Sequence, residues 1–188
     1  NGSGVAIGDI NNDGLLDIFF GGNQVADRLY LNKGDFKFED ISKSSKILLS
    51  PGWTWGVTMV DINADGYLDI YVSRNGTSMN PSDRKNKLFI NNKDLTFTES
   101  SLKYGLADTG FSTQAAFFDM DNDGDLDMYQ VNQPPDKKVL LINKIPEKQL
   151  KLFQDRLYRN DNGKFKDVSK EAGISSEMVY GLSINTSD

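Results

Sequence analysis

The chain of 188 residues contains no cysteine and no histidine. It can therefore form no disulfide, no thiolate nucleophile, no Cys/His zinc site and no histidine general base. No apolar run approaches the roughly 20 residues that a transmembrane helix needs. Acidic residues outnumber basic ones 27 to 21, giving a formal net charge of -6. Since a nucleic-acid surface needs clustered Lys and Arg, we expect neither a nucleic-acid partner nor a transmembrane segment.

What the chain does contain is a repeated acidic stretch. The residues that lead into it are GSGVAIGD (2–9), TWGVTMVD (54–61), STQAAFFD (112–119) and GLSINTSD (181–188). The first three copies continue as DINNDGLLDIFF, DINADGYLDIYV and DMDNDGDLDMYQ, and the fourth stops at Asp188. A second shared segment follows each full copy: RLYLNKGDFKFEDIS from Arg28, KLFINNKDLTFTESS from Lys87 and RLYRNDNGKFKDVS from Arg156. The repeat indicates one structural unit per copy, and both ends are expected to be truncated.

Each unit is predicted to contain about four short strands. Apolar residues alternate after the acidic stretch, as in Leu16, Ile18 and Phe20, and the stretch before it is short and apolar. The second shared segment predicts two strands joined by a tight turn, and SLKYGL and SKEAGI predict helical turns. We therefore predict an all-β fold of four-stranded units, the size of propeller blades, over residues 1–188. The expected units are 1–50, 51–110 and 111–178, with the start of another at 179–188.

The acidic stretches place oxygen-bearing side chains at alternate positions. Counted from the first aspartate, positions 1, 3, 5 and 9 are Asp or Asn, position 6 is glycine and position 8 is leucine. Ca²⁺ takes roughly six to eight oxygen ligands, which alternate residues of a tight turn can supply. Glycine permits the turn, position 7 would offer its backbone carbonyl, and the leucine would anchor the loop to the core. The predicted ligands of three Ca²⁺ sites are Asp9, Asn11, Asp13, Leu15 and Asp17; Asp61, Asn63, Asp65, Tyr67 and Asp69; and Asp119, Asp121, Asp123, Asp125 and Asp127.

An EF-hand loop shares this first half, and position 12 separates the two. An EF-hand needs a glutamate there and a helix on each side. Position 12 is Phe20, Val72 or Gln130 here, and the flanks are predicted strands. We therefore predict calcium loops that position 9 closes within a β-hairpin. The alternatives are a solvated Asp/Asn/Gly turn and a pair of catalytic carboxylates, and catalysis does not explain the triplication.

Charge favours a structural cation in these loops. Carboxylates packed within a few ångströms of one another repel, and three divalent cations would neutralise the net charge of -6. The third loop has aspartate at position 3, where the first two have asparagine. We therefore predict that it binds Ca²⁺ most tightly.

The repeated D-x-[DN]-x-D-G-x-x-D, followed by L-[YF]-x-N and a Phe-containing strand, resembles the FG-GAP and VCBS-type repeats. Those repeats build the propeller of integrin α subunits and of many secreted bacterial proteins. The D-[IM]-[YF] after the loop and SKEAGI are most similar to bacterial relatives of cartilage acidic protein. The resemblance implies a propeller of roughly seven blades, of which this chain would be under half. It also implies structural calcium, and roles in adhesion or assembly more often than catalysis.

The leading hypothesis is a non-enzymatic, calcium-stabilised propeller that binds other proteins or surface glycans. It would be extracellular or on the cell surface, as an exported or outer-membrane bacterial protein. One alternative is an accessory scaffold subunit of a bacterial outer-membrane complex. Another is the propeller of a polysaccharide-degrading enzyme whose active site lies outside these residues.

Three further features have two interpretations each. Trp53 and Trp55 form either a sugar-stacking platform or packing between blades. The connection from Asn132 to Asp155 is either a solvated insertion or a contact surface. The sequons at Asn75 and Asn185 matter only in a eukaryotic secretory route. The lysines of the connection are Lys137, Lys138, Lys144, Lys148 and Lys151.

Overall fold

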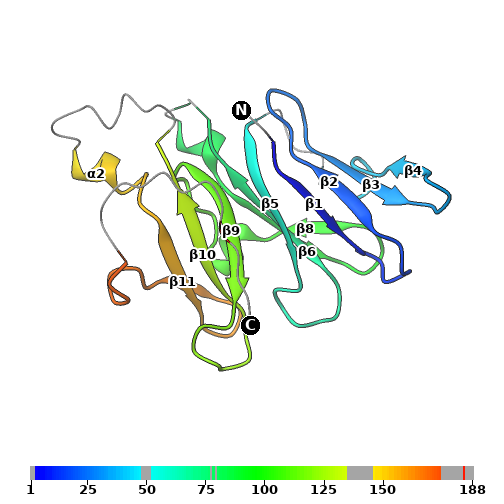
Figure 1. The fold of residues 1–188 in the computed structure, drawn as a ribbon. Coiled ribbons are helices and arrows are strands. Elements are labelled where there is room, and N and C mark those ends of the chain that lie inside the picture. Colours follow the sequence, from blue (N-terminus) through cyan, green and yellow to red (C-terminus); the bar gives the residue numbers. More distant parts are fainter. Residues whose placement is uncertain are drawn as a thin grey trace.

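The computed structural model describes residues 3–47, 52–76, 78, 80–134, 146–174 and 184 (Figure 1). Their strands form three four-stranded antiparallel sheets. The first sheet is β1 (Val5–Gly8), β2 (Asp17–Phe20), β3 (Arg28–Asn32) and β4 (Phe38–Asp40). The second is β5 (Thr54–Val60), β6 (Asp69–Arg74), β7 (Lys87–Asn91) and β8 (Phe97–Glu99). The third is β9 (Ser112–Phe118), β10 (Asp127–Asn132), β11 (Arg156–Asn160) and β12 (Phe165–Asp167). The prediction of an all-β fold with four strands per repeat is confirmed.

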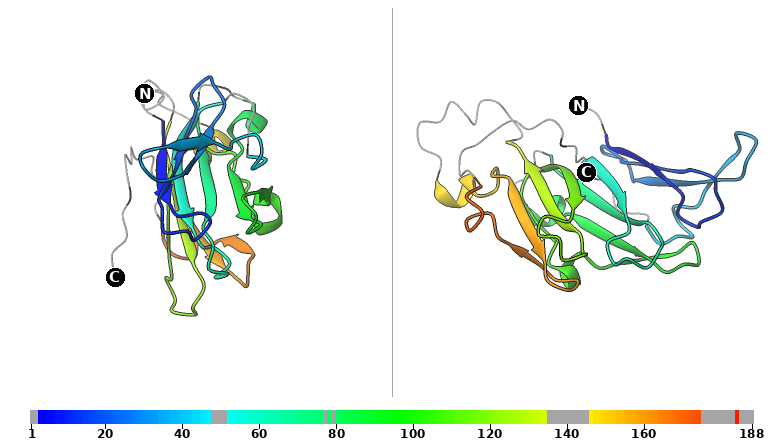
Figure 2. Two further views of the ribbon diagram at one scale, coloured as in Figure 1. Left: turned by 90° about the vertical axis from the view of Figure 1, so that its right-hand side faces the viewer. Right: turned by 60° about the horizontal axis from the view of Figure 1, so that its bottom comes forward.

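The three sheets stand side by side like successive blades (Figures 1 and 2). Their first strands are neighbours, because β1 contacts β5 and β5 contacts β9. Within each sheet the strands follow chain order, so the last strand lies farthest from this centre. Short helices occur only in the connections: η1 (Pro81–Arg84), α1 (Ser101–Tyr104) and α2 (Glu147–Leu150) among the described residues.

Two apolar cores hold the sheets together. The first lies between sheets one and two and includes Phe19, Leu29, Ile70 and Val72. The second lies between sheets two and three and includes Tyr71, Leu88, Met128 and Tyr158. Ile70 and Val72 point to the first core and Tyr71 to the second, so every residue of β6 is buried. A strand covered on both faces needs apolar residues at consecutive positions, which Ile70, Tyr71 and Val72 supply.

The described residues cover the first sheet on one face only. Phe19 is fully buried in the first core, while Val5, Ile7 and Phe20 on the opposite face are 50%, 59% and 42% exposed. The alternating residues that predicted this strand therefore lie on its exposed face, and Phe19 between them faces the core. The period of two identified the strand correctly, but it does not say which face is buried.

Both predicted helical turns form after the fourth strands. α1 ends at Gly105, whose φ of 79° is left-handed, and a Cβ there would lie 2.6 Å from the carbonyl oxygen of Phe165. Leu106 N–H donates to Ser101 O and closes this turn. In SKEAGI, Ile174 N–H donates to Ser169 O in the same way, and Gly173 also has a positive φ. Glycine is required because other residues rarely adopt this conformation.

The other predicted features divide between described and undescribed residues. Trp53 and Trp55 are half-buried at the start of β5. Asn75 is buried and its side-chain amide donates to Phe111 O at 2.9 Å, so it is no accessible glycosylation site. Lys151 is exposed and pairs with Glu147. The features that lie outside the described residues are Asn185, Asp188, Lys137, Lys138, Lys144 and the side chain of Lys148. No helix in the described part of the chain is both long and apolar enough to cross a membrane.

Candidate metal centre

The three acidic loops join the first two strands of each sheet and lie at the same end of the molecule. In Figure 1 they form the lower turns between β1 and β2, between β5 and β6, and between β9 and β10. All fifteen predicted ligand residues belong to these loops, five to each. The fold therefore brings each predicted set together within its own hairpin and keeps the three sets separate.

The aspartate at position 1 organises the backbone of each loop. In the second loop, Asp61 Oδ1 accepts the N–H of Asp65 at 2.9 Å and Oδ2 accepts that of Gly66 at 2.7 Å. Asp9 and Asp119 make the equivalent bonds in their loops. These bonds fold the chain around the first carboxylate and define the path of the loop backbone. These side-chain to backbone bonds span only four and five residues, so they are local and follow from the sequence.

Two positions in each loop adopt left-handed backbone conformations. The position 6 glycines have φ values of 84°, 86° and 91°, as predicted from the sharp turn. Position 4 is also left-handed, which the sequence analysis did not anticipate. Asn12 and Asn122 suit this conformation, whereas Ala64 adopts it at φ 53° despite its Cβ. The repeated Asn at position 4 was the available signal.

The aspartate at position 9 is the most buried member of each loop. Asp17, Asp69 and Asp127 are all 0% exposed. Asp69 accepts the N–H of Ile62 at 3.2 Å and the N–H of Asn91 at 2.8 Å, one on each oxygen. The same pair of bonds occurs at Asp17 and Asp127. Burial raises the pKa of Asp69 to about 6, with backbone hydrogen bonds lowering it and Asp65 and Asp61 raising it further. Through its two hydrogen bonds, to Ile62 in the loop and to Asn91 in the third strand, Asp69 joins the loop to that strand.

The leucine at position 8 was expected to anchor the loop to the core, but it does not. Leu16 is 57% exposed, and Leu68 and Leu126 are only half-buried. The burial belongs instead to position 9 and, in the first two loops, to the isoleucine at position 2: Ile10 and Ile62 are 2% and 3% exposed. Because successive strand residues face opposite sides, burying Asp at position 9 turns Leu at position 8 outward.

An asparagine that ends each third strand completes the loop. Asn91 donates its side-chain N–H to Leu68 O at 3.1 Å and to Ile10 O, in the neighbouring sheet's loop, at 2.8 Å. Asn32 and Asn160 make the equivalent bond to Leu16 O and Leu126 O. The repeated L-[YF]-x-N contains this residue, but its role depends on the hairpin lying beside the loop. The first two loops also touch, through Asn12 Nδ2 and Gly66 O at 2.9 Å.

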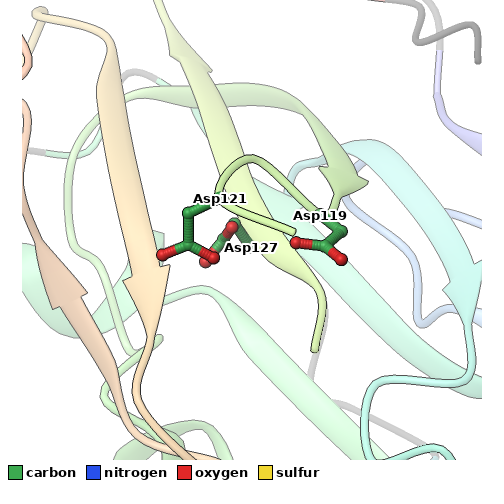
Figure 3. Close-up of side chains that lie close together, drawn as sticks. All are labelled: Asp119, Asp121 and Asp127. Atoms are coloured by element: carbon green, nitrogen blue, oxygen red, sulfur yellow. The ribbon is translucent and has the colours of Figure 1, made fainter. Parts of the chain in front are cut away.

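The third loop has the closest group of carboxylates. Ligand atoms of Asp119, Asp121 and Asp127 all lie within 4.8 Å of one another. Figure 3 shows Asp127 between the other two side chains. Desolvation raises the pKa of Asp121, and the neighbouring charges of Asp123, Asp127 and Asp119 raise it further. Such a group is unfavourable by itself, and its hard oxygen donors suit a cation such as Ca²⁺. In the first two loops position 3 is asparagine, which carries no charge.

A second repeated polar residue, which was not predicted from the sequence, lies at the opposite end of each sheet. Asp27, Asn86 and Asp155 directly precede the third strands. Each accepts the backbone N–H at the end of, or just after, the second strand, at 2.7, 2.7 and 2.8 Å. The repeated DRLY, NKLF and DRLY were the available signal. These residues fix the second hairpin of each blade and are not near the acidic loops.

Replacing Asp155 with asparagine, the residue type at Asn86, should change how stability depends on pH. Burial raises the pKa of Asp155, while bonds from Asn132 N–H and the Tyr129 hydroxyl lower it. Since the folded pKa lies above the ordinary 3.8, the stabilisation from this group is complete below that pH and is lost as pH rises through the folded pKa. Wild type should lose this stabilisation as the pH rises from about 4 to 7, whereas D155N should not. The stability of D155N minus that of wild type should therefore increase over this range. Urea denaturation at both values measures this, and a constant difference would contradict it.

Comparison with known proteins agrees with the repeat seen in the three sheets. The model of the family described as FG-GAP-like repeat matches residues 2–72 and 77–129. Cartilage acidic protein 1 of Xenopus tropicalis is 38% identical over 76 residues, which make up 40% of this chain and 12% of that protein. The chain thus corresponds to a small part of that relative's length. Because the family model covers more than half of the sequence, including all three acidic loops, this chain belongs to the FG-GAP-like repeat family.

Proposed function

We propose that this protein is a calcium-stabilised β-propeller segment that acts as an interaction scaffold. Each acidic loop would hold one Ca²⁺ with the residues at positions 1, 3, 5 and 9 and the backbone carbonyl at position 7. The ion supplies positive charge at the centre of the loop. The residues of the chain provide the shape, because the bonds at positions 1 and 9 already fix the loop and join it to the third strand.

The observation that carries this proposal is the equivalence of the three loops. They share their hydrogen bonds at positions 1, 5 and 9 and their left-handed residues at positions 4 and 6. A solvated turn would not bury a carboxylate in every copy, because burying a charge without a counter-charge is costly. The convergence of three carboxylates in the third loop supports a cation there most directly.

Isothermal titration calorimetry of the chelator-treated protein should show three Ca²⁺ per chain. We expect the third loop to bind most tightly, because all four of its proposed side-chain ligands are aspartates, against three in each of the other loops. The D121N variant gives this loop the asparagine that the first two have at position 3, and should weaken its binding about tenfold. Fewer than three ions would contradict the stoichiometry, and an unchanged profile in D121N would contradict the ranking.

We further propose that the protein is extracellular or at the cell surface and binds other proteins or surface glycans. Membership of the FG-GAP-like repeat family and similarity to cartilage acidic protein 1 support this proposal. A rigid core with loops at both ends of its sheets suits such a scaffold, since loops carry most binding residues. Glycan arrays and pull-downs from extracellular fractions, with and without calcium, would test it. If the protein binds no glycan and captures no protein with or without calcium, the proposal is contradicted.

A further inference from the structure

One lysine lies directly against the second acidic loop. Lys93 belongs to the turn between β7 and β8, two residues after Asn91. Its ammonium nitrogen is 3.4 Å from Asp65 Oδ2 and 3.3 Å from the backbone oxygen of Asp65. The same nitrogen lies over the ring of Tyr67, 5.1 Å from its centroid. Lys93 thus contacts positions 5 and 7 of the loop, both of them proposed cation ligands.

The first and third loops have no equivalent lysine. The residue two positions after the hairpin asparagine is Gly34 in the first sheet and Asn162 in the third. Asn162 approaches its loop through a backbone N–H to Asp125 Oδ2 at 3.3 Å. Arg159, the nearby cation of the third sheet, is bonded twice to Asp161, at 2.8 and 3.2 Å. Among the described residues, only the second loop has a side-chain ammonium on its position 5 carboxylate.

We propose that Lys93 is the resident counter-ion of the second loop, so that this loop depends less on calcium than the others and binds it more weakly. The proposal rests on the proposed function of the loops as Ca²⁺ sites. In the calcium-free loop, the ammonium offsets the repulsion between Asp61, Asp65 and Asp69. An arriving cation must share Asp65 with the ammonium or displace it, and the two like charges repel each other. The side chain is 46% exposed, so it is free to move into water when displaced.

Terbium luminescence can test this, because its signal should be strongest at the second loop. Tb³⁺ is a calcium surrogate that emits when a nearby tyrosine is excited, and only the second loop has tyrosine among its proposed ligands. Competition of Ca²⁺ against this signal then gives the affinity of that loop. We expect K93Q to tighten Ca²⁺ binding about three- to tenfold, and K93R, which keeps the charge, to change it less than about twofold. K37Q is the control for net charge, because Lys37 is exposed and forms no ion pair with a described residue.

Thermal unfolding in chelator separates this inference from the proposed function. Without calcium, K93Q should melt about 1 to 3 °C below K37Q, because it leaves the carboxylates uncompensated. Equal melting temperatures for K93Q and K37Q in chelator would overturn the inference whether or not the loops bind calcium. Unchanged Ca²⁺ affinity in K93Q would overturn it as well. A wild-type protein that binds no Ca²⁺ would instead refute the proposed function.

Discussion

Replacing Asp69 with alanine should lower the free energy of unfolding of the calcium-free protein by about 2–6 kcal/mol. Asp69 is fully buried and accepts the N–H groups of Ile62 and Asn91, one on each carboxylate oxygen. Alanine leaves both donors without an acceptor in a place that water does not reach. Each unsatisfied buried donor costs about 1–3 kcal/mol, which sets the expected range. Urea denaturation in the presence of chelator measures the effect.

The matched control is D65A, in the same loop. Asp65 is a proposed ligand as well, but its side chain is 25% exposed, and the hydrogen bond that it accepts from Tyr67 N–H is only part-buried. In chelator, D65A should change the free energy of unfolding by less than about 1 kcal/mol. With calcium present, both variants should lose binding at the second loop. If D69A proves as stable as D65A in chelator, the buried carboxylate does not tie the loop to the third strand.

Saturating calcium should raise the melting temperature by roughly 16–32 °C over the chelated protein. A ligand at a hundred times its Kd stabilises the folded state by about 2.7 kcal/mol per site, and three independent sites add. For a chain of 188 residues, each kcal/mol corresponds to about 2–4 °C. The physical source is relief of carboxylate repulsion in loops whose shape is already fixed. Differential scanning calorimetry across a calcium titration provides the measurement.

Magnesium at equal ionic strength is the control for non-specific screening. Mg²⁺ demands shorter bonds and a stricter octahedron than these carboxylate and carbonyl donors favour, so its effect should be smaller. A variant with Asn in place of Asp9, Asp61 and Asp119 should lose most of the calcium response. If chelator and calcium give the same melting temperature, the cations have no structural role in this protein.

The repeat and the local geometry of the loops could be predicted from the sequence. Alternation of apolar residues identifies the strands, and glycine at position 6 marks the turn, because both reflect conformations of neighbouring residues along the chain. The position 1 carboxylate follows too, since it bonds to N–H groups only four and five residues away. The fold class, the three loops and their candidate ligands were therefore within reach of the sequence.

Burial and the partners of each loop were decided by the tertiary structure. Leu16 was expected in the core and is exposed, whereas Asp17 beside it is buried, because Asn32 from the third strand supplies the N–H that a buried carboxylate needs. The sequence around Asp17 does not show that Asn32, which is 15 residues away, supplies this N–H. Lys93 likewise meets Asp65 only because the turn between β7 and β8 lies beside this loop. The sequence determined which residues form each loop, and the packing of hairpins and sheets determined which of them are buried and which charges they meet.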